Sequence, residues 1–361
     1  MNILDHHELT ATPFLISMIS LQDKKFINSD YCSTTISPAA IRNATGNSST
    51  IKKNSAVLAA FGEYNERLNL FYNLCTEIPM LTGFSLFDDT QIKVNPATVY
   101  MDFSLKGLRN HKKSFTDSCG LASHVSSDLA LYSAIGEFIE RQSLIATWLG
   151  KRSGKEYEAK ALSSDFKMNN VLNRFTDIFE YFKLYDISIF PGVYVLLLLG
   201  INDTDFSIGI SASCSFSDAF CGALDEFQQS YESILLFHNS DQKRKQDRYK
   251  EGFLNQSPWE LRDKYLFLEA SKKVELNKEK FEISDGDQLT AMKHNLASIG
   301  LKCYAVSIIP SIGPNLRIVK VMSPDAFPHM NTEILEPSEY KITNLIRMNE
   351  FPNIGKQLPF P

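Results

Sequence analysis

One short stretch of the sequence, SAIGEFIER at residues 133–141, carries most of the information about this chain. It lies within residues 127–149, where apolar residues return at steps of three and four, the period of an amphipathic helix. Residues three apart on a helix share a face, so we expect Glu137 and Glu140 to point the same way. Phe138 is expected on a different face, in the core. The stretch therefore predicts a helix with one acidic side.

The same pattern occurs twice more along the chain. GEYNER at 62–67 repeats the Gly, the aromatic residue and the paired Glu within a second predicted helix, 56–72. ALDEFQQ at 223–229 is an altered copy within a third predicted helix, 217–237. A single Glu-x-x-Glu-Arg is a weak signal, because exposed helices are rich in Glu and Arg. Two matched copies and a variant favour a shared function.

We expect the acidic faces of the three helices to meet at one site. They carry five carboxylates and one amide: Glu63, Glu66, Glu137, Glu140, Glu226 and Gln229. Like charges a few ångströms apart repel, and desolvation adds to the cost, so such a site needs cations. Carboxylate oxygens select Mg²⁺, which commonly accompanies nucleotide phosphates. The five Glu residues are therefore candidate metal ligands, and Arg67 and Arg141 are expected to address phosphate oxygens or to hold the carboxylates.

The rest of the chain mixes strand and helix signals, which predicts mixed α and β content. Apolar and β-branched runs predict strands at 98–103, 192–199, 206–212, 303–309 and 317–322. An apolar run at 14–21 follows acidic and histidine residues, so it predicts a buried strand and not a signal peptide. Two highly charged stretches, 240–251 and 271–287, predict solvated helix faces or a mobile insertion.

Composition and charge argue against several classes of protein. A hydrophobic content of 43% with 22% charged residues is typical of globular proteins, so we expect no general disorder. A net charge of −5 shows no basic excess of the kind that marks a general nucleic-acid binder. No run reaches the roughly 18 apolar residues of a membrane helix. The six cysteines contain no Cys-x-x-Cys pair and the seven histidines no His-x-x-x-His, so zinc ribbons and His-based metal sites lack support.

These motifs resemble those of the YcaO family. The family's Ser-x-x-x-Glu-x-x-Glu-Arg and Glu-x-x-Gln patterns are matched by Ser133, Glu137, Glu140, Arg141, Glu226 and Gln229. SCGLASH at 118–124 resembles the family's Ser-Asn-Gly-x-Ala loop, and LPFP at 358–361 is similar to its proline-rich ending. The resemblance covers 44–361 and leaves 1–43 as an N-terminal segment outside it. It implies one YcaO-type α+β domain, with mixed sheets and repeated helices converging on a nucleotide site, where length alone suggests about two domains.

Within the family, the chain resembles the cyclodehydratase subunits of microcin B17/klebsazolicin-type azole peptide synthetases. Landmarks of that group are similar to residues 62–67, 119–120, 229–231, 323–325 and 329–331. The chain also departs from the family. It lacks the Gly-Lys-Gly loop of many members near 44–53, so contacts of that segment with nucleotide stay open. Cys119 replaces a usual Asn, but no departure removes a carboxylate.

The resemblance implies an ATP-dependent cyclodehydratase subunit. A Cys, Ser or Thr side chain of a ribosomal precursor peptide attacks the preceding carbonyl, and ATP phosphorylates the former amide oxygen, so that phosphate leaves and a thiazoline or oxazoline remains. In that scheme ATP and Mg²⁺ are held by Ser133 and the six residues of the acidic faces. Arg67 and Arg141 offset developing charge. The terminal carboxylate of Pro361 is a candidate base, and the tail is expected to be ordered and directed into the nucleotide site.

The resemblance also implies partners. These are the precursor peptide, a leader-binding scaffold subunit resembling ubiquitin-activating enzymes, and an FMN-dependent azoline dehydrogenase, acting in cytoplasmic bacteriocin biosynthesis without nucleic acid or membrane. Two alternatives stay open. Thioamide or amidine formation would use the same ATP site with another nucleophile. A catalytically silent nucleotide-sensing subunit would keep the fold, although the intact carboxylates argue against silence.

Overall fold

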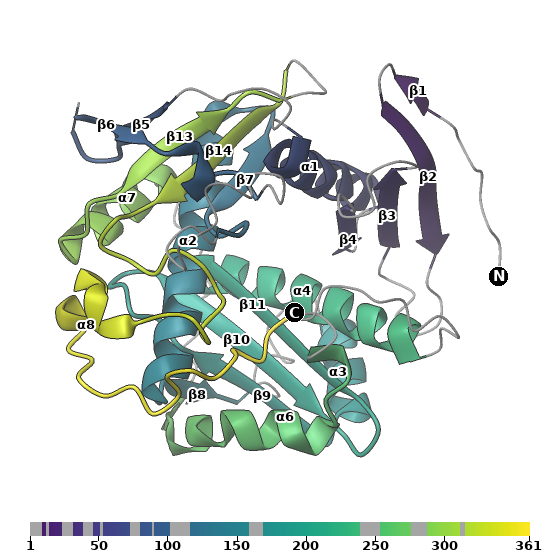
Figure 1. The fold of residues 1–361 in the computed structure, drawn as a ribbon. Coiled ribbons are helices and arrows are strands. Elements are labelled where there is room, and N and C mark those ends of the chain that lie inside the picture. The colour runs from purple at the N-terminus through teal and green to yellow at the C-terminus, as the bar shows by residue number, and fades with distance from the viewer. Residues whose placement is uncertain are drawn as a thin grey trace. The chain divides into compact units, whose positions relative to one another are not determined.

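A computed structural model gives the structure of the chain (Figure 1). It describes residues 9–11, 14–23, 32–38, 46–50, 53–72, 80–88, 90–101, 116–158, 169–238, 253–275, 287–310 and 315–361. The chain divides into two compact units. Unit 1 comprises Met1–Arg141, Asp287–Met330 and Ser338–Leu345, and unit 2 comprises Gln142–Gly286, Asn331–Pro337 and Ile346–Pro361. Both units contain helices and largely antiparallel sheets, which confirms the predicted α+β class.

The described part of unit 1 contains two antiparallel sheets. The first has the order β1-β2-β3-β4, with bounds Leu9–Ala11, Phe14–Asp23, Cys32–Pro38 and Gly46–Thr50. The second has the order β6-β5-β13-β14-β7, with β5 at Leu81–Ser85, β6 at Gln91–Val94, β7 at Leu121–His124, β13 at Tyr304–Ile308 and β14 at Arg317–Met322. Strands predicted at 14–21, 303–309 and 317–322 are therefore confirmed as β2, β13 and β14.

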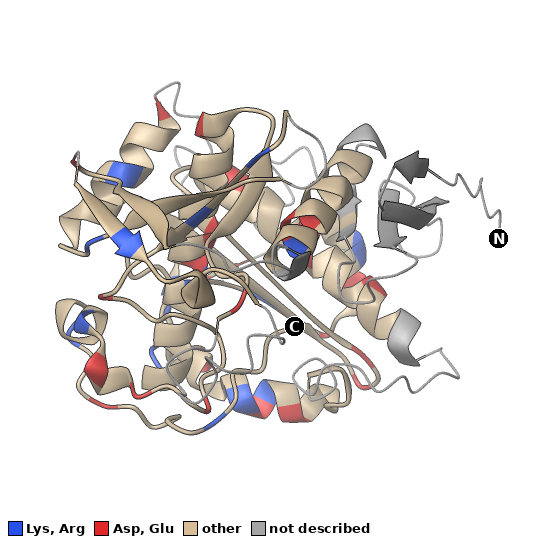
Figure 2. Cartoon of the chain, turned by 45° about the horizontal axis from the view of Figure 1, so that its top comes forward, with Lys and Arg blue, Asp and Glu red and all other residues tan. Residues whose placement is uncertain are grey.

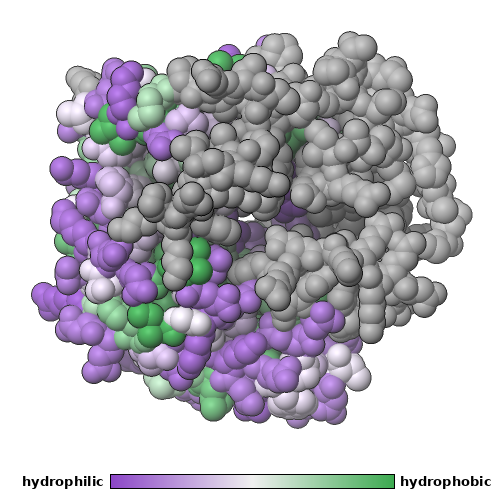
Figure 3. Space-filling view, in the orientation of Figure 1, coloured by the Kyte–Doolittle hydropathy of each residue, from purple (hydrophilic) through white to green (hydrophobic). Residues whose placement is uncertain are grey.

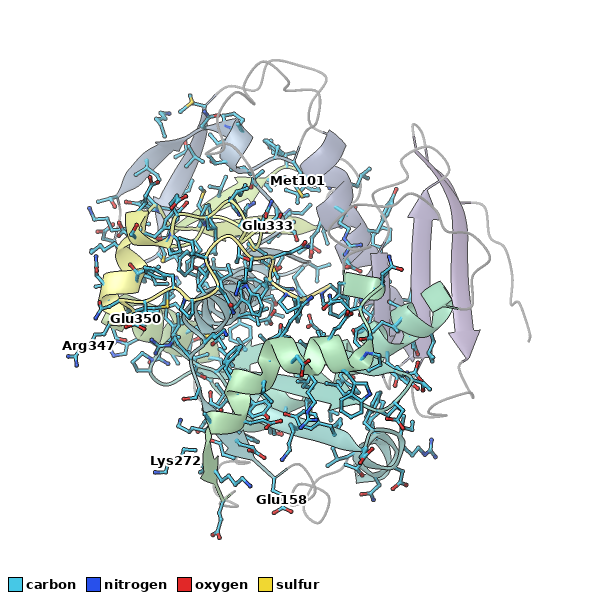
Figure 4. All side chains as sticks on the ribbon, turned by 60° about the horizontal axis from the view of Figure 1, so that its bottom comes forward. Met101, Glu158, Lys272, Glu333, Arg347 and Glu350 are labelled. Carbon is cyan, nitrogen blue, oxygen red and sulfur yellow. The ribbon has the colours of Figure 1, made fainter. Side chains whose placement is uncertain are left out.

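The α-helices in the described part of unit 1 are α1 (Lys53–Tyr72), the first part of α2 (Ser127–Gly150), α7 (Gln288–Ser298) and α8 (Lys341–Leu345). Helix α1 packs against β7. Gly62 allows this approach, because a Cβ there would lie only 3.0 Å from Ser123 Oγ. The apolar core beneath the second sheet consists of Leu70, Val94, Val99, Tyr100, Leu121, Val306, Ile308 and Ile318. Met101, labelled in Figure 4, packs against this core from its margin.

The prediction of a strand at 98–103 is wrong for residues 98–101, which the structure describes. Pro96–Thr98 forms a 3-10 turn, η1, in which the Asn95 side chain caps the Ala97 N–H at 2.9 Å. Val99 and Tyr100 are buried in the core, and Met101 N donates to Leu70 O at 3.1 Å. An apolar run of this length fits a buried turn as well as a strand, and packing against α1 decided between them.

Unit 2 is built on a sheet with the order β11-β10-β9-β8-β12. Its strands are β8 (Lys155–Tyr157), β9 (Tyr181–Asp186), β10 (Tyr194–Ile201), β11 (Phe206–Ser213) and β12 (Lys272–Val274), and only the β8–β12 pair is parallel among the pairs of this sheet. Strands β10 and β11 confirm the predictions at 192–199 and 206–212. The unit also contains the second part of α2, α3 (Asn169–Ile178), α4 (Phe216–His238), α6 (Pro258–Tyr265) and the 3-10 helix η4 (Leu266–Ala270).

Helix α4 packs closely on β11, as Figure 1 shows. Gly209 makes this possible, because a Cβ there would lie 2.2 Å from Ala223 O. The helix also supplies Phe227, whose ring meets those of Phe175 and Phe179 edge-on at centroid distances of 5.0 and 5.3 Å. The three predicted helices at 56–72, 127–149 and 217–237 are thus confirmed as α1, α2 and α4.

Several other expectations concern the surface and the connecting segments. Charges of both signs are interspersed over the described elements (Figure 2), and the coloured part of the face in Figure 3 is mainly hydrophilic, with some hydrophobic residues among it. Residues 240–251 lie outside the described part. Within 271–287 the structure describes β12 and Asp287, which is the N-cap of α7, and 276–286 also lie outside the described part. Within the described ranges, no helix is both long and apolar enough to cross a membrane.

Candidate nucleotide site

The acidic face of α1 lies against β7. Glu63 Oε1 is 2.5 Å from Arg67 Nη2 one turn further along the helix. Glu66 lies beside Ser123 of β7. Burial raises the pKa of Glu66 to about 7, and the negative charge of Glu63 adds to the rise, while hydrogen bonding with Ser123 and the Arg67 charge oppose it. The structure therefore brings Glu63, Glu66 and Arg67 together, in surroundings that penalise the ionised form of Glu66.

The acidic face of α2 shows the same arrangement with a different geometry. Arg141 Nε lies 3.4 Å from Glu140 Oε1 and 3.8 Å from Glu137 Oε1, between the two carboxylates. Glu140 is buried, with 6% of its surface exposed, whereas Ser133 two turns earlier is exposed. Arg141 thus offsets two partly or fully buried negative charges on one helix.

The third copy lies in unit 2. Glu226 Oε2 accepts a hydrogen bond from Ile210 N of β11 at 3.3 Å. Because β11 is an edge strand of its sheet, this carboxylate occupies the open side of the strand. Gln229, three residues further along α4, is half-buried. The meeting of the α1, α2 and α4 faces stays a prediction.

Sequence reasoning missed a polar cluster in unit 1 that includes Asp117, Lys320 and His329. Lys320 on β14 is buried, with its ammonium directed at Thr116 Oγ1 (3.1 Å) and Asp117 O (2.5 Å). Asp117 Oδ2 accepts from Met330 N at 2.7 Å. A Lys inside the apolar strand RIVKVM is a signal of this cluster, but its partners are distant in sequence.

Burial controls the ionisation of the other groups in this cluster. It lowers the pKa of His329 to about 4, against the pull of the Asp117 charge, so His329 is neutral near pH 7. Burial also raises the pKa of the Cys119 thiol well above its usual range, with Asp117 adding to the rise. Cys119 is therefore an unreactive thiol at neutral pH.

The donor chemistry of unit 1 fits Mg²⁺ with a nucleotide. Among the described residues, no three His, Cys, Asp or Glu side chains gather into a group that could hold a metal ion by themselves. Mg²⁺ usually keeps several waters and takes only one or two protein carboxylates together with phosphate oxygens, so it needs no such group. Paired carboxylates on α1 and α2, each beside an Arg, supply ligands of this kind. Which carboxylates bind the metal stays a prediction.

The tail of the chain packs into unit 2. Leu358 and Phe360 are buried, with 1% and 3% of their surface exposed. The Tyr265 hydroxyl donates to Pro359 O at 3.0 Å, and the Trp148 indole N–H donates to Lys356 O at 3.2 Å. The expected packing of the tail is therefore present. Its direction into a nucleotide site is not tested by these contacts.

Known proteins resemble the chain in sequence and in fold. It is 26% identical over 261 residues to the microcin B17-processing protein McbD of Escherichia coli, covering 68% of this chain and 63% of that protein, so the match spans less than two thirds of the relative. The fold is similar to a chain of the E. coli microcin synthetase McbBCD complex with pro-MccB17 bound, with a TM-score of 0.71, 21% identity and coverage of 96% and 97%. It is also similar to YcaO from Methanopyrus kandleri bound with AMPPCP and Mg²⁺, with a TM-score of 0.69, 14% identity and coverage of 90% and 88%.

A family model places these likenesses in one group. The model of the YcaO cyclodehydratases, described as ATP- and Mg²⁺-binding, matches residues 33–326. This range includes α1, α2 and α4 and therefore every acidic residue of the repeated motif. The expected resemblance is confirmed: the chain belongs to the YcaO cyclodehydratase family, whose cofactors are ATP and Mg²⁺.

Proposed function

We propose that this chain is the subunit that forms azoline rings in a ribosomal precursor peptide at the expense of ATP. The observation that carries the proposal is the family match over 33–326, which includes the paired acidic residues with their arginines. The nucleophiles would be Cys, Ser or Thr of the peptide, and the products thiazolines or oxazolines. Residues 44–361 would form the catalytic domain.

In this proposal the acidic faces hold Mg²⁺ and order the nucleotide. Glu63, Glu66, Glu137, Glu140 and Glu226 would offer metal ligands, and Gln229 and Ser133 would contact the nucleotide. Arg67 lies 2.5 Å from Glu63, and Arg141 lies between Glu137 and Glu140. Because phosphoryl transfer depends mainly on positioning and charge stabilisation, these two guanidinium groups would orient the carboxylates and offset charge on phosphate oxygens.

The reaction needs a leaving group and a base. When bound, ATP supplies the phosphoryl group that turns the former amide oxygen into a leaving group. A proton must also leave the attacking side chain and the amide nitrogen. The terminal carboxylate of Pro361 is the candidate base that accepts this proton. Leu358 and Phe360 are buried and Tyr265 donates a hydrogen bond to Pro359 O, which limits the motion of Pro361. Residues appended after Pro361 should suppress cyclisation more than they suppress ATP binding.

The proposal includes partners. The relative is named as a microcin B17-processing protein, and a structure of similar fold belongs to a complex that contains pro-MccB17. We therefore propose a precursor peptide as substrate and further subunits as partners: a leader-binding scaffold resembling ubiquitin-activating enzymes and an FMN-dependent azoline dehydrogenase. The cytoplasm would be the site of the reaction.

Mass spectrometry tests the activity. A candidate precursor peptide is co-expressed with this chain and with the proteins encoded beside it, and the mass of the peptide is measured. Loss of one water per modified residue, dependent on this chain and on ATP, is the expected result. Exchange of oxygen for sulfur would point to thioamide formation instead. An unmodified peptide, together with nucleotide binding but no peptide-dependent ATP turnover, would favour the nucleotide-sensing subunit.

A further inference from the structure

Lys320 in unit 1 carries its ammonium in a buried position, with 2% of its surface exposed. Its Nζ donates to Thr116 Oγ1 at 3.1 Å, Asp117 O at 2.5 Å and, at a longer 3.5 Å, Val99 O. Thr116 Oγ1 donates its own proton to Thr98 O at 3.0 Å, so it accepts from the lysine. Three acceptors surround a group that has three N–H bonds only when it is protonated. The contacts therefore describe a charged ammonium.

These contacts fasten one loop, residues 116–120, to the strand that carries Lys320. Asp117 Oδ1 accepts from Cys119 N at 2.9 Å, which closes the loop on itself. Val321 N, next to Lys320, donates to Gly120 O at 2.7 Å. Gly120 has a φ of +71°, and a Cβ there would lie 2.2 Å from Val321 O, so only glycine permits this contact. Loop 116–120 is thus held at both ends by β14.

The same loop touches α2 at the acidic motif. The Cβ position of Gly120 lies 3.5 Å from Phe138 Cβ, and Phe138 follows Glu137 in the chain. Burial lowers the pKa of Lys320, and the charge of Asp117 and, more weakly, that of Glu137 oppose this lowering. Gly120 therefore contacts Val321, which follows the buried Lys320, and Phe138, which follows the predicted nucleotide-binding Glu137.

A charge in this position is costly. Burying an ammonium needs compensation by hydrogen bonds and by opposite charge, and an apolar residue of similar volume often serves stability equally well. The stem of Lys320 already lies among the apolar residues of its sheet: Lys320 pairs with Val306 on β13 and with Leu121 on β7, both in the core. Packing alone would therefore favour an apolar residue here, and the charge has to be accounted for separately.

We propose that Lys320 is a positioning residue of the nucleotide site: its buried ammonium holds loop 116–120 beside Glu137 and adds a positive charge that favours phosphates bound near the acidic motif. The inference rests on the proposed function, because it takes Glu137 to be part of the ATP site. It assigns Lys320 no contact with the nucleotide.

The test compares the affinities of the full-length chain for AMP, ADP and AMPPCP, each with Mg²⁺, by calorimetry. Lys320→Met removes the charge and keeps most of the stem. The affinity for AMPPCP should fall about tenfold or more, with a smaller loss for ADP and the smallest for AMP, because a lost positive charge acts in proportion to the charge of the ligand. A purely structural role would weaken all three nucleotides alike. Lys302→Met makes the same charge change at an exposed position of unit 1 and should stay within about twofold of wild type.

A second variant keeps the test decisive if Lys320→Met does not fold. Thr116→Val removes one acceptor of the ammonium but keeps the charge, so it should weaken the three nucleotides by the same factor, about two to five. The inference is overturned if Lys320→Met binds AMPPCP with wild-type affinity, or if it loses affinity for the three nucleotides equally. If Lys320→Met does not fold, wild-type affinity in Thr116→Val overturns it. A wild-type chain that binds AMPPCP but never cyclises a peptide would sink the proposed activity and leave the inference standing.

Discussion

A single methyl group added at Gly209 on β11 should displace α4, the helix that carries Glu226. In Gly209→Ala the new Cβ would lie 2.2 Å from Ala223 O, 2.4 Å from Phe227 N and 2.7 Å from Phe227 Cα. All three atoms are backbone atoms of α4, so no side-chain rotation relieves the clash. Ordinary contacts between carbon and its neighbours need about 3.5 Å, so α4 has to move away from the sheet by about 1 Å.

The size of the effect follows from this geometry. Overpacking of a tight interface costs about 1–3 kcal/mol and occasionally more, and we expect at least about 3 kcal/mol here because the backbone has to move. Glu226 lies on the same side of α4, and its 3.3 Å hydrogen bond with Ile210 N should break. Urea unfolding should report the lost stability, and amide hydrogen exchange should report faster exchange at Ile210.

Gly222 provides the matched control at the same interface. In Gly222→Ala the new Cβ would lie 2.4 Å from Ser211 Oγ, which can rotate away, and 2.9 Å from Ser211 Cβ, which cannot, so a shift of a few tenths of an ångström is needed. The helix gains about 0.5–1 kcal/mol from replacing Gly by Ala, which offsets part of this cost, so the loss of stability should be clearly smaller than in Gly209→Ala. The reasoning is refuted if the two variants lose the same free energy of unfolding, or if Gly209→Ala unfolds like wild type.

Three further predictions concern single side chains. Glu140→Gln should abolish peptide-dependent ATP turnover and leave thermal unfolding nearly unchanged, because it relieves the repulsion between two carboxylates in the metal-free protein while Glu137 stays beside Arg141. Unchanged turnover would mean that the repeated motif is only architectural. The pKa of Glu66 is about 7 in the folded protein and 4.5 in the unfolded chain, so the stability of the metal-free protein should fall as the pH rises from 4.5 to about 7. Urea unfolding should show that Glu66→Gln removes this fall. Tyr265→Phe leaves Pro359 O without its donor, which should cost about 1–3 kcal/mol and speed amide exchange at Phe360, while equal exchange in both proteins would show that the tail does not depend on this bond.

The repeated acidic motif was readable in the sequence because helix geometry is local. Period and spacing alone place Glu137 and Glu140 on one face, and α2 begins and ends within one residue of the predicted bounds. The ion pairs with Arg141 follow from the same spacing. Local patterns were less informative at 98–103, where an apolar run is compatible with either a strand or a buried turn, and packing of Val99 and Tyr100 in the core decided it.

The sequence by itself determined the mixed α and β content, the three acidic helices and the motifs by which the family is recognised, since each of these is a pattern among residues that lie within a few positions of one another. Only the tertiary structure decided that Lys320 is a buried cation, that Asp117 binds Met330 N, and that Glu66 has a raised pKa beside Ser123. Each of these properties depends on how deeply a charge is buried and on which partners reach it. Those partners come from segments far apart in the chain, and folding alone brings them within hydrogen-bonding distance.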